Sequence, residues 1–342
     1  MDHFTTRDGT RIAYDDQDPG GTAGPVLLLH GLAGHLGEWD DLTPRLLADG
    51  HRVIRYDARG HGASTRTPSD MTRAAAVSDA AALLTHLRVP PATLLGQSLG
   101  GLTALQLAAR HPDLVSHLIL IEAGPAGPNP SLPTQIATWL DSWPTPFPTL
   151  TEATTFLGHE AWSRGLEKHE DGYHPRFTRD TILAAIQELS TNHYWPDWSH
   201  ITCPTLLLRG EKGTMRPEEA EEMQSRRPDT QVKVITGAGH DVHLDRPEAV
   251  YEAIAAFLRT AEDRRRDAVP LAHPHATDGA VAERSPVFRR RPRRRIMMML
   301  ESSIQTGAPS EKAGHGQRVA VRDPDGGQQT PSTRRSLRGG PQ

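Results

Sequence analysis

The chain has 342 residues, of which 38 are Lys or Arg and 42 are Asp or Glu, so its net charge is -4. This near-neutral balance does not favour a nucleic-acid-binding domain. The one cysteine, Cys203, excludes an internal disulfide scaffold and favours a reducing compartment. Hydrophobic residues make up only 36%, so either the core is unusually polar or a packed domain is averaged with a disordered segment.

The charges are unevenly distributed along the chain. Residues 261–342 carry a net charge of +7, whereas residues 1–260 carry -11. The C-terminal segment has no Trp or Tyr and is rich in Pro, Gly, Ser and Arg, so it cannot bury enough apolar surface to offset the entropy of ordering. We therefore predict a folded domain over residues 1–260 and a disordered, basic tail over residues 261–342.

Strand-like and helix-like segments alternate along the domain. A hairpin around Asp8-Gly9 opens it. Apolar runs typical of strands buried on both faces follow, at 26–29, 53–56, 93–95, 117–121, 205–208 and 232–235. Helical segments are expected at Leu42–Ala48, Met71–Leu87, Leu99–Ala109, Glu218–Arg226 and Pro247–Leu258. The alternation predicts an α/β fold with a mainly parallel sheet covered by helices on both faces.

Residues 124–200 interrupt this alternation. They contain many prolines, helix-like pieces and no clear strand, and five of the six Trp residues lie there. These aromatics can form the small core of a helical insertion, or line the roof of a pocket, and both can hold at once. The pocket candidates are Trp139, Trp143, Trp162 and Trp195.

The segment Gly96–Gly100 reads G-Q-S-L-G, follows a predicted strand and opens a helix. That context is the one required of a nucleophile elbow, in which Gly96 and Gly100 permit a strained turn that exposes Ser98. The alternative is a Gly-rich helix start with Ser98 as a capping residue.

Two further glycine-containing turns follow predicted strands. In the turn after 26–29, the backbone N–H of Leu32 would form an oxyanion hole together with that of Leu99, and the His30 side chain is expected to brace the loop. In the turn after 232–235, His240 follows glycines that permit a tight approach, which suits a general base. The nearby His243 is expected to be structural.

Together these turns and the segment Asp57–Gly62 (D-A-R-G-H-G) resemble the α/β-hydrolase fold over about Phe4–Arg259. The resemblance implies an eight-stranded, mainly parallel sheet with a helical lid at residues 124–200. It also implies the serine-nucleophile branch, because Ser98 stands where related dehalogenases and epoxide hydrolases carry an aspartate.

The acid of a Ser-His-acid triad has two candidates. Many members of this fold carry an Asp a few residues after the strand at 205–208, where this chain has glycine and offers Glu211 instead. Some relatives place the acid one strand earlier, where this chain has Glu122 at a buried strand end. An unpaired carboxylate there is costly, and a hydrogen bond to His240 would supply its partner, so Glu122 is preferred.

These residues predict a cofactor-free serine hydrolase that cleaves an ester, thioester, lactone or similar acyl bond of a small, apolar substrate. The alternatives on the same site are hydrolysis of a carbon–carbon bond and cofactor-free perhydrolysis or oxygenation. A third is a signalling protein that binds a small molecule and keeps a vestigial triad.

The sequence predicts no cofactor and no metal, because its 18 histidines show no metal-ligand spacing. No secretory signal or membrane-length apolar run is visible, so a cytoplasmic protein is expected. The arginines between Arg289 and Arg295 are read as part of a non-functional tail, with weak electrostatic binding to nucleic acid or membrane as the alternative. Apart from a small-molecule substrate no stable partner is expected, and the oligomeric state is left open.

Overall fold

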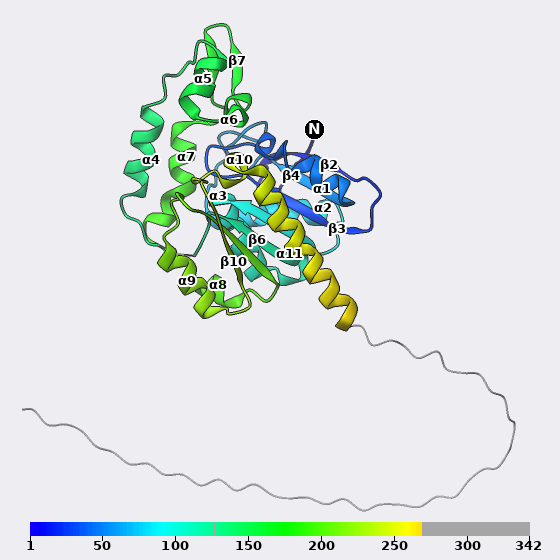
Figure 1. Ribbon diagram of the computed structural model, residues 1–342. Helices are drawn as coiled ribbons and strands as arrows, with labels where there is room; N and C mark the ends of the chain where they lie inside the picture. The colour runs from blue at the N-terminus through cyan, green and yellow to red at the C-terminus, as the bar shows by residue number, and fades with distance from the viewer. Residues whose placement is uncertain (126, 269–342) are drawn as a thin grey trace, which may run out of the picture. The chain divides into compact units, whose positions relative to one another are not determined.

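The computed structural model describes residues 1–125 and 127–268, with side chains described as far as residue 260. Eight strands form one sheet in the order β1-β2-β4-β3-β5-β6-β9-β10 (Figure 1). The β1–β2 and β2–β4 pairs are antiparallel, and the remaining neighbours in this sheet are parallel. This confirms the mainly parallel, eight-stranded α/β fold.

The strands are β1 Asp2–Thr5, β2 Arg11–Gln17, β3 Ala23–Leu29, β4 His51–Tyr56, β5 Ala92–Gln97, β6 Val115–Ile121, β7 Glu167–His169, β8 Gly172–His174, β9 Thr205–Gly210 and β10 Gln231–Ile235. The α-helices are α1 Thr43–Ala48, α2 Arg73–His86, α3 Ser98–Arg110, α4 Leu132–Asp141, α5 Leu150–Leu157, α6 Glu160–Arg164, α7 Arg179–Ile186, α8 Trp195–His200, α9 Pro217–Arg226, α10 Val242–Asp245 and α11 Pro247–Ala268. Three 3-10 helices complete the described elements: η1 Leu36–Trp39, η2 Pro112–Leu114 and η3 Gln187–Ser190.

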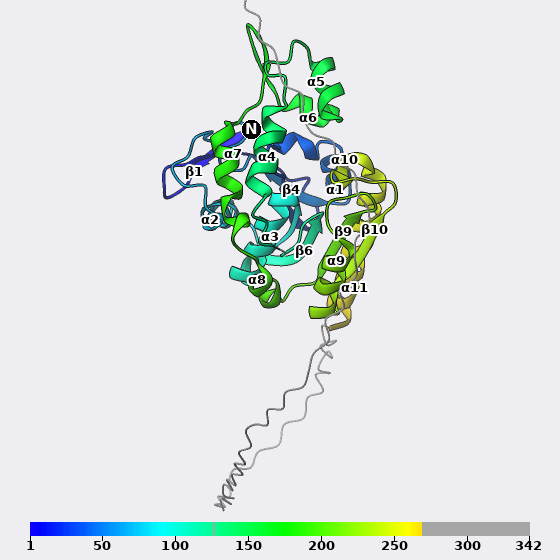
Figure 2. The same ribbon diagram turned by 90° about the vertical axis from the view of Figure 1, so that its left-hand side faces the viewer.

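Alternate side chains of the central strands enter two separate cores, because successive residues of a strand point to opposite faces of the sheet. Leu118 and Leu120 of β6 pack with α2, α3, α8 and α9, whereas Ile119 and Ile121 pack with α1, α10 and α11. Figures 1 and 2 show α11 crossing the sheet on the face opposite to α3. The apolar runs in the sequence are therefore explained by burial on both faces.

β10 departs from this pattern because it is the edge of the sheet. Its burial is mostly low, and Val234 is 48% exposed. The prediction that residues 232–235 form a strand is correct, but the prediction that the strand is buried on both faces is wrong.

The insertion between β6 and β9 contains α4 to α7 and a short β7–β8 hairpin. Figure 1 shows α5, α6 and β7 projecting beyond the sheet. The helical character is as predicted, whereas the hairpin was not expected, because its three-residue strands contain mostly polar side chains. Its pairing is extended by an isolated bridge between Phe147 and Tyr173.

Polar contacts attach this insertion to the rest of the domain. Arg66 donates to both carboxylate oxygens of Glu167 at 2.8 and 3.0 Å, and these two side chains remain about a third exposed. His35 Nε2 lies 2.8 Å from the Ala161 carbonyl oxygen.

The last helix, α11, continues eight residues past the predicted boundary at residue 260. Residues 269–342, which hold most of the predicted tail, lie outside the described residues. In the described ranges, none of the helices combines the length and the apolar character needed to cross a membrane.

A buried acid lies under the loop that carries His240. Glu38 of η1 and His243 of α10 are both buried, with 3.7 Å between Glu38 Oε2 and His243 Nε2. Burial raises the pKa of Glu38 to about 8 and lowers the pKa of His243 to about 4. The contact therefore joins two neutral groups at pH 7 rather than an ion pair.

We predict that Glu38 makes stability fall as pH rises. The contribution of the neutral Glu38 carboxyl to the unfolding free energy is complete below its ordinary pKa of 4.5 and is lost as pH rises through about 8. The loss amounts to about 1.4 kcal/mol for each unit by which the folded and unfolded pKa values differ. Urea unfolding at pH 5 to 9 should show a steeper loss of unfolding free energy for wild type than for Glu38→Gln. Glu252→Gln, at an exposed position of α11, is the matched control, and equal slopes for wild type and Glu38→Gln would refute the prediction.

Candidate active site

Ser98 lies where β5 turns into α3, with a φ angle of 50°. Two glycines make this strained turn possible by permitting close backbone approach. A Cβ on Gly96 would lie 2.5 Å from the Gly100 carbonyl oxygen, and a Cβ on Gly100 would lie 2.3 Å from the His30 carbonyl oxygen. The G-Q-S-L-G pattern thus has the strand–turn–helix geometry of a nucleophile elbow.

The loop after β3 lies against the elbow. The backbone N–H of Ala33 donates to His61 Nε2 at 3.1 Å, and the N–H of Ala58 donates to His30 Nε2 at 2.9 Å. Burial lowers the pKa of His30 to about 4 and that of His61 to about 3, so both rings are neutral at pH 7 and can accept these bonds. His30 braces the loop, as its sequence context predicts.

Leu32 and Leu99 line the same cavity as Ser98. Leu99 is in the first turn of α3, where backbone N–H groups have no partner within the helix. The N–H of Ala33, next to Leu32, is already bonded to His61. The backbone groups of Leu32 and Leu99 are thus the candidates to receive negative charge.

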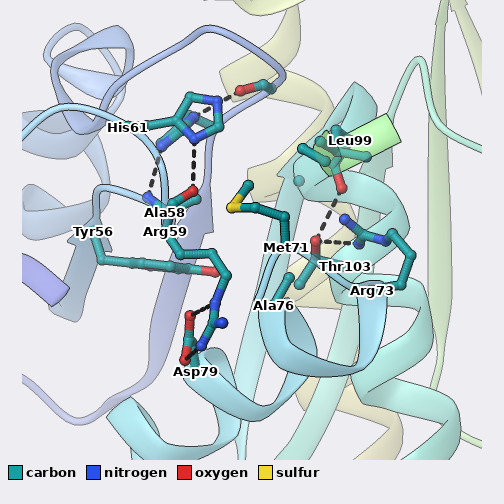
Figure 3. A pocket seen from close by; sticks show the side chains of 14 residues that line it. Tyr56, Ala58, Arg59, His61, Met71, Arg73, Ala76, Asp79, Leu99 and Thr103 are labelled. Carbon is teal, nitrogen blue, oxygen red and sulfur yellow. Dashed lines mark hydrogen bonds and ion pairs between the residues drawn. The ribbon is translucent and has the colours of Figure 1, made fainter. Parts of the chain in front are cut away.

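Behind the elbow, a small cavity of about 30 Å³ is lined by buried polar groups. Figure 3 shows the Arg59 guanidinium facing the Asp79 carboxylate, which accepts two bonds of 2.6 Å. In the same view Arg73 donates to Thr103 Oγ1, which in turn donates to the Leu99 carbonyl oxygen at 3.0 Å. These contacts join α2 to the loop after β4 and to α3.

Glu122 follows β6 directly and adopts a left-handed backbone, with a φ angle of 49°. Its side chain is fully buried and accepts bonds from the backbone N–H groups of Gly210 (2.7 Å), Thr214 (2.7 Å) and Met215 (3.0 Å). Burial alone would raise the pKa of this carboxyl. The hydrogen bonds from His240 and the backbone outweigh burial, and the pKa lies below its ordinary value.

The His240 ring meets this carboxylate through Nδ1, which lies 3.4 Å from Glu122 Oε2 and 2.9 Å from Thr214 Oγ1. Thr214 Oγ1 is itself 3.4 Å from Glu122 Oε2. One arrangement satisfies all three groups: Nδ1–H donates to both oxygens while the Thr214 hydroxyl donates to the carboxylate. The ring is then oriented with Nε2 free of its proton.

Glu211, the other candidate acid, lies elsewhere. Its carboxylate accepts the backbone N–H of Gly237 at 2.8 Å and its side chain is exposed. Among the described contacts it has none to His240. The structure brings Glu122, not Glu211, to the imidazole.

Ser98, Glu122 and His240 line one cavity of about 650 Å³. The cavity lies between the ends of the strands and the insertion. Its wall from the insertion includes Leu132, Ile136, Trp139, Trp162, Ile186 and Leu189.

Two of the four predicted pocket tryptophans are therefore in the cavity wall, Trp139 and Trp162, and two are not. Trp143 packs behind them, with its ring centroid 5.2 Å from that of Trp139, in a small core with Phe147. Trp195 of α8 packs on the core formed with α3, with Arg226 over its ring at 4.2 Å. The prediction fails for Trp143 and Trp195 because the sequence does not show which side of the insertion faces the sheet.

Two residues next to the triad candidates were not singled out in the sequence. They are Thr214 and Gln97, and the Gln97 amide nitrogen lies 3.3 Å from the His240 carbonyl oxygen. Gly213 could have indicated the position of the acid from the sequence alone. A glycine where relatives carry an acid indicates that the side chain of another residue fills the space of the missing one. A Cβ on Gly213 would lie 2.2 to 2.4 Å from the carboxyl atoms of Glu122.

Comparison with known proteins assigns the fold family. The family model for the alpha/beta hydrolase fold matches residues 24–247, so the chain belongs to that family. The sn-1-specific diacylglycerol lipase ABHD11 of Mus musculus is 28% identical over 265 residues, covering 72% of this chain and 85% of its own length. Esterase YbfF of Escherichia coli (strain K12) is 27% identical over 241 residues, covering 68% and 92%.

A solved structure is similar in fold. E-2-(acetamidomethylene)succinate hydrolase superposes with a TM-score of 0.67 at 22% identity, over 75% of this chain and 98% of that one. This likeness shows the fold, and the relatives named as a lipase and an esterase make the chain a hydrolase of the α/β fold.

We predict that Gly213→Ala disturbs the carboxylate of Glu122. The new methyl group needs the space of that carboxylate, so the side chain must shift and lose backbone hydrogen bonds, at a cost of about 1–3 kcal/mol in unfolding free energy. Gly24→Ala, where a Cβ meets nothing within 4 Å, is the control. Urea unfolding of both variants tests this, and equal midpoints would contradict it.

Proposed function

We propose that the chain is a serine hydrolase that cleaves an ester, thioester or similar acyl bond of a small, apolar substrate. The observation that carries this proposal is the meeting of three groups in one cavity. Ser98 stands on its strained turn, and the His240 ring faces the buried Glu122 carboxylate through Nδ1. The relatives named as a lipase and an esterase support the same class of reaction.

In each half-reaction of the proposed mechanism His240 acts first as a general base and then as a general acid. Ser98 Oγ attacks the acyl carbon while His240 Nε2 takes its proton, and the Leu32 and Leu99 N–H groups stabilise the oxyanion. Collapse breaks the bond to the leaving group, which receives the proton from His240. Water then repeats the sequence on the acyl-enzyme, and Glu122 stabilises the imidazolium each time.

Electrostatics favour Glu122 in this role. A buried carboxylate with a lowered pKa stays ionised near neutral pH, so it can accept from Nδ1–H and hold the ring in the tautomer that leaves Nε2 as the base. Thr214 would assist as a positioning residue, since its hydroxyl contacts both groups.

Replacement of Ser98 tests the nucleophile. We expect a fluorophosphonate probe to label wild type and not Ser98→Ala, and hydrolysis of p-nitrophenyl butyrate to fall by about 10,000-fold or more in the variant. Labelling that persists in Ser98→Ala would refute the assignment. Labelling of wild type without turnover of any ester would instead favour carbon–carbon bond hydrolysis or a binding role.

A paired substitution tests the acid. We expect Glu122→Gln to lower kcat by about 1,000-fold, because an amide at this position holds His240 in the wrong tautomer, while Glu211→Gln lowers it less than about threefold. Steady-state kinetics with p-nitrophenyl butyrate and a melting curve for each variant separate catalysis from folding. The reverse order of effects would transfer the role to Glu211.

A further inference from the structure

The cavity wall on the insertion side is mostly apolar, with Asn129 and Gln135 as its polar residues. Leu132, Ile136 and Trp139 lie on one face of α4, at the spacing of successive helical turns. Trp162 and the α7–η3 residues Ile186 and Leu189 continue this surface. An acyl chain attached to Ser98 would therefore extend along hydrocarbon and indole groups.

The ionisable residues that line the cavity are acidic apart from His240. They are Glu122 and Asp241, and among the described residues that line it there is neither Lys nor Arg. Glu122 is matched by His240 and by backbone N–H groups. A carboxylate that enters the cavity thus finds no cation to replace its hydration.

Asp241 differs from Glu122 because its charge is not matched. It is partly buried, and among the described residues its side chain accepts a hydrogen bond from the Gln97 amide, which lies 3.4 Å from Oδ1. In the part of the chain that the structure describes, it forms no ion pair with Lys or Arg. Two negative charges that are partly surrounded by protein repel each other more strongly than they would in water.

We propose that the cavity takes an uncharged, apolar acyl chain and rejects acyl chains that end in a carboxylate. Asp241 sets this charge selection. The inference rests on the proposed function, since it names the substrate class of the same site. Family membership does not decide it: the named relatives include a lipase and a hydrolase of a succinate derivative.

A matched pair of esters measures the selection. p-Nitrophenyl hexanoate and mono-p-nitrophenyl adipate share a six-carbon acyl chain, which ends in a methyl group in one and a carboxylate in the other. We expect kcat/KM for the hexanoate to be at least about tenfold higher at pH 7.5. Methyl p-nitrophenyl adipate, which has the added bulk without the charge, should recover most of this difference.

Two substitutions test whether Asp241 sets the charge selection. The measured quantity is the ratio of kcat/KM for hexanoate to kcat/KM for adipate, in which general effects on His240 cancel. Asp241→Asn should lower the ratio about threefold or more, whereas Glu252→Gln, which removes one charge from an exposed position of α11, should not change it. Gln135→Lys adds a cation at an exposed position of the cavity wall and should also lower the ratio, with Gln135→Met as its neutral control.

The outcomes separate this inference from the proposed function. Equal kcat/KM for hexanoate and adipate, or an unchanged ratio in Asp241→Asn, overturns the inference and leaves the hydrolase proposal intact. If no ester is hydrolysed, the proposed function fails, and tryptophan fluorescence titration with hexanamide and adipic acid monoamide decides the selection. Tighter binding of hexanamide then supports the inference, and equal binding overturns it.

Discussion

The buried carboxylate of Glu122 is the constraint on which the rest of the site depends. A charge removed from water must be matched by hydrogen bonds or by an opposite charge. Here the N–H groups after β9 and the His240 ring supply the match. One side chain therefore fixes the β9 loop and the imidazole relative to the end of β6.

The elbow imposes a second constraint at the neighbouring strand. Ser98 and Glu122 both adopt left-handed backbone conformations, at the C-terminal ends of β5 and β6, which pair side by side. Such conformations cost of order 1–3 kcal/mol each and persist only where the surroundings determine them. The surroundings are the glycine contacts at the elbow and the hydrogen bonds around Glu122. Two strained residues and a buried carboxylate thus lie at the neighbouring C-terminal ends of β5 and β6.

Local sequence signals predicted the alternation of strands and helices, and the family resemblance implied the eight-stranded sheet and the helical insertion. Continuous apolar runs and glycine turns placed the strands, the helices and the turns that carry Ser98 and His240, and the alternation of strands and helices is confirmed. The β7–β8 hairpin was not predicted because tertiary contacts, not strand propensity, stabilise its polar three-residue strands. Trp143 and Trp195 were misplaced because burial depends on which face of the insertion meets the sheet. The choice between Glu122 and Glu211 needs three-dimensional contacts, because both residues follow buried strands.

The close approach of Gly213 to Glu122 has a consequence for how this site can change over time. A side chain at position 213 would occupy the space that the Glu122 carboxylate fills, so positions 122 and 213 cannot be altered independently. A side chain gained first at position 213 collides with the carboxylate already there. A carboxylate lost first at position 122 leaves backbone donors and an imidazole without an acceptor. Either order passes through an impaired protein, so relocation of the acid in this lineage would require two coupled substitutions.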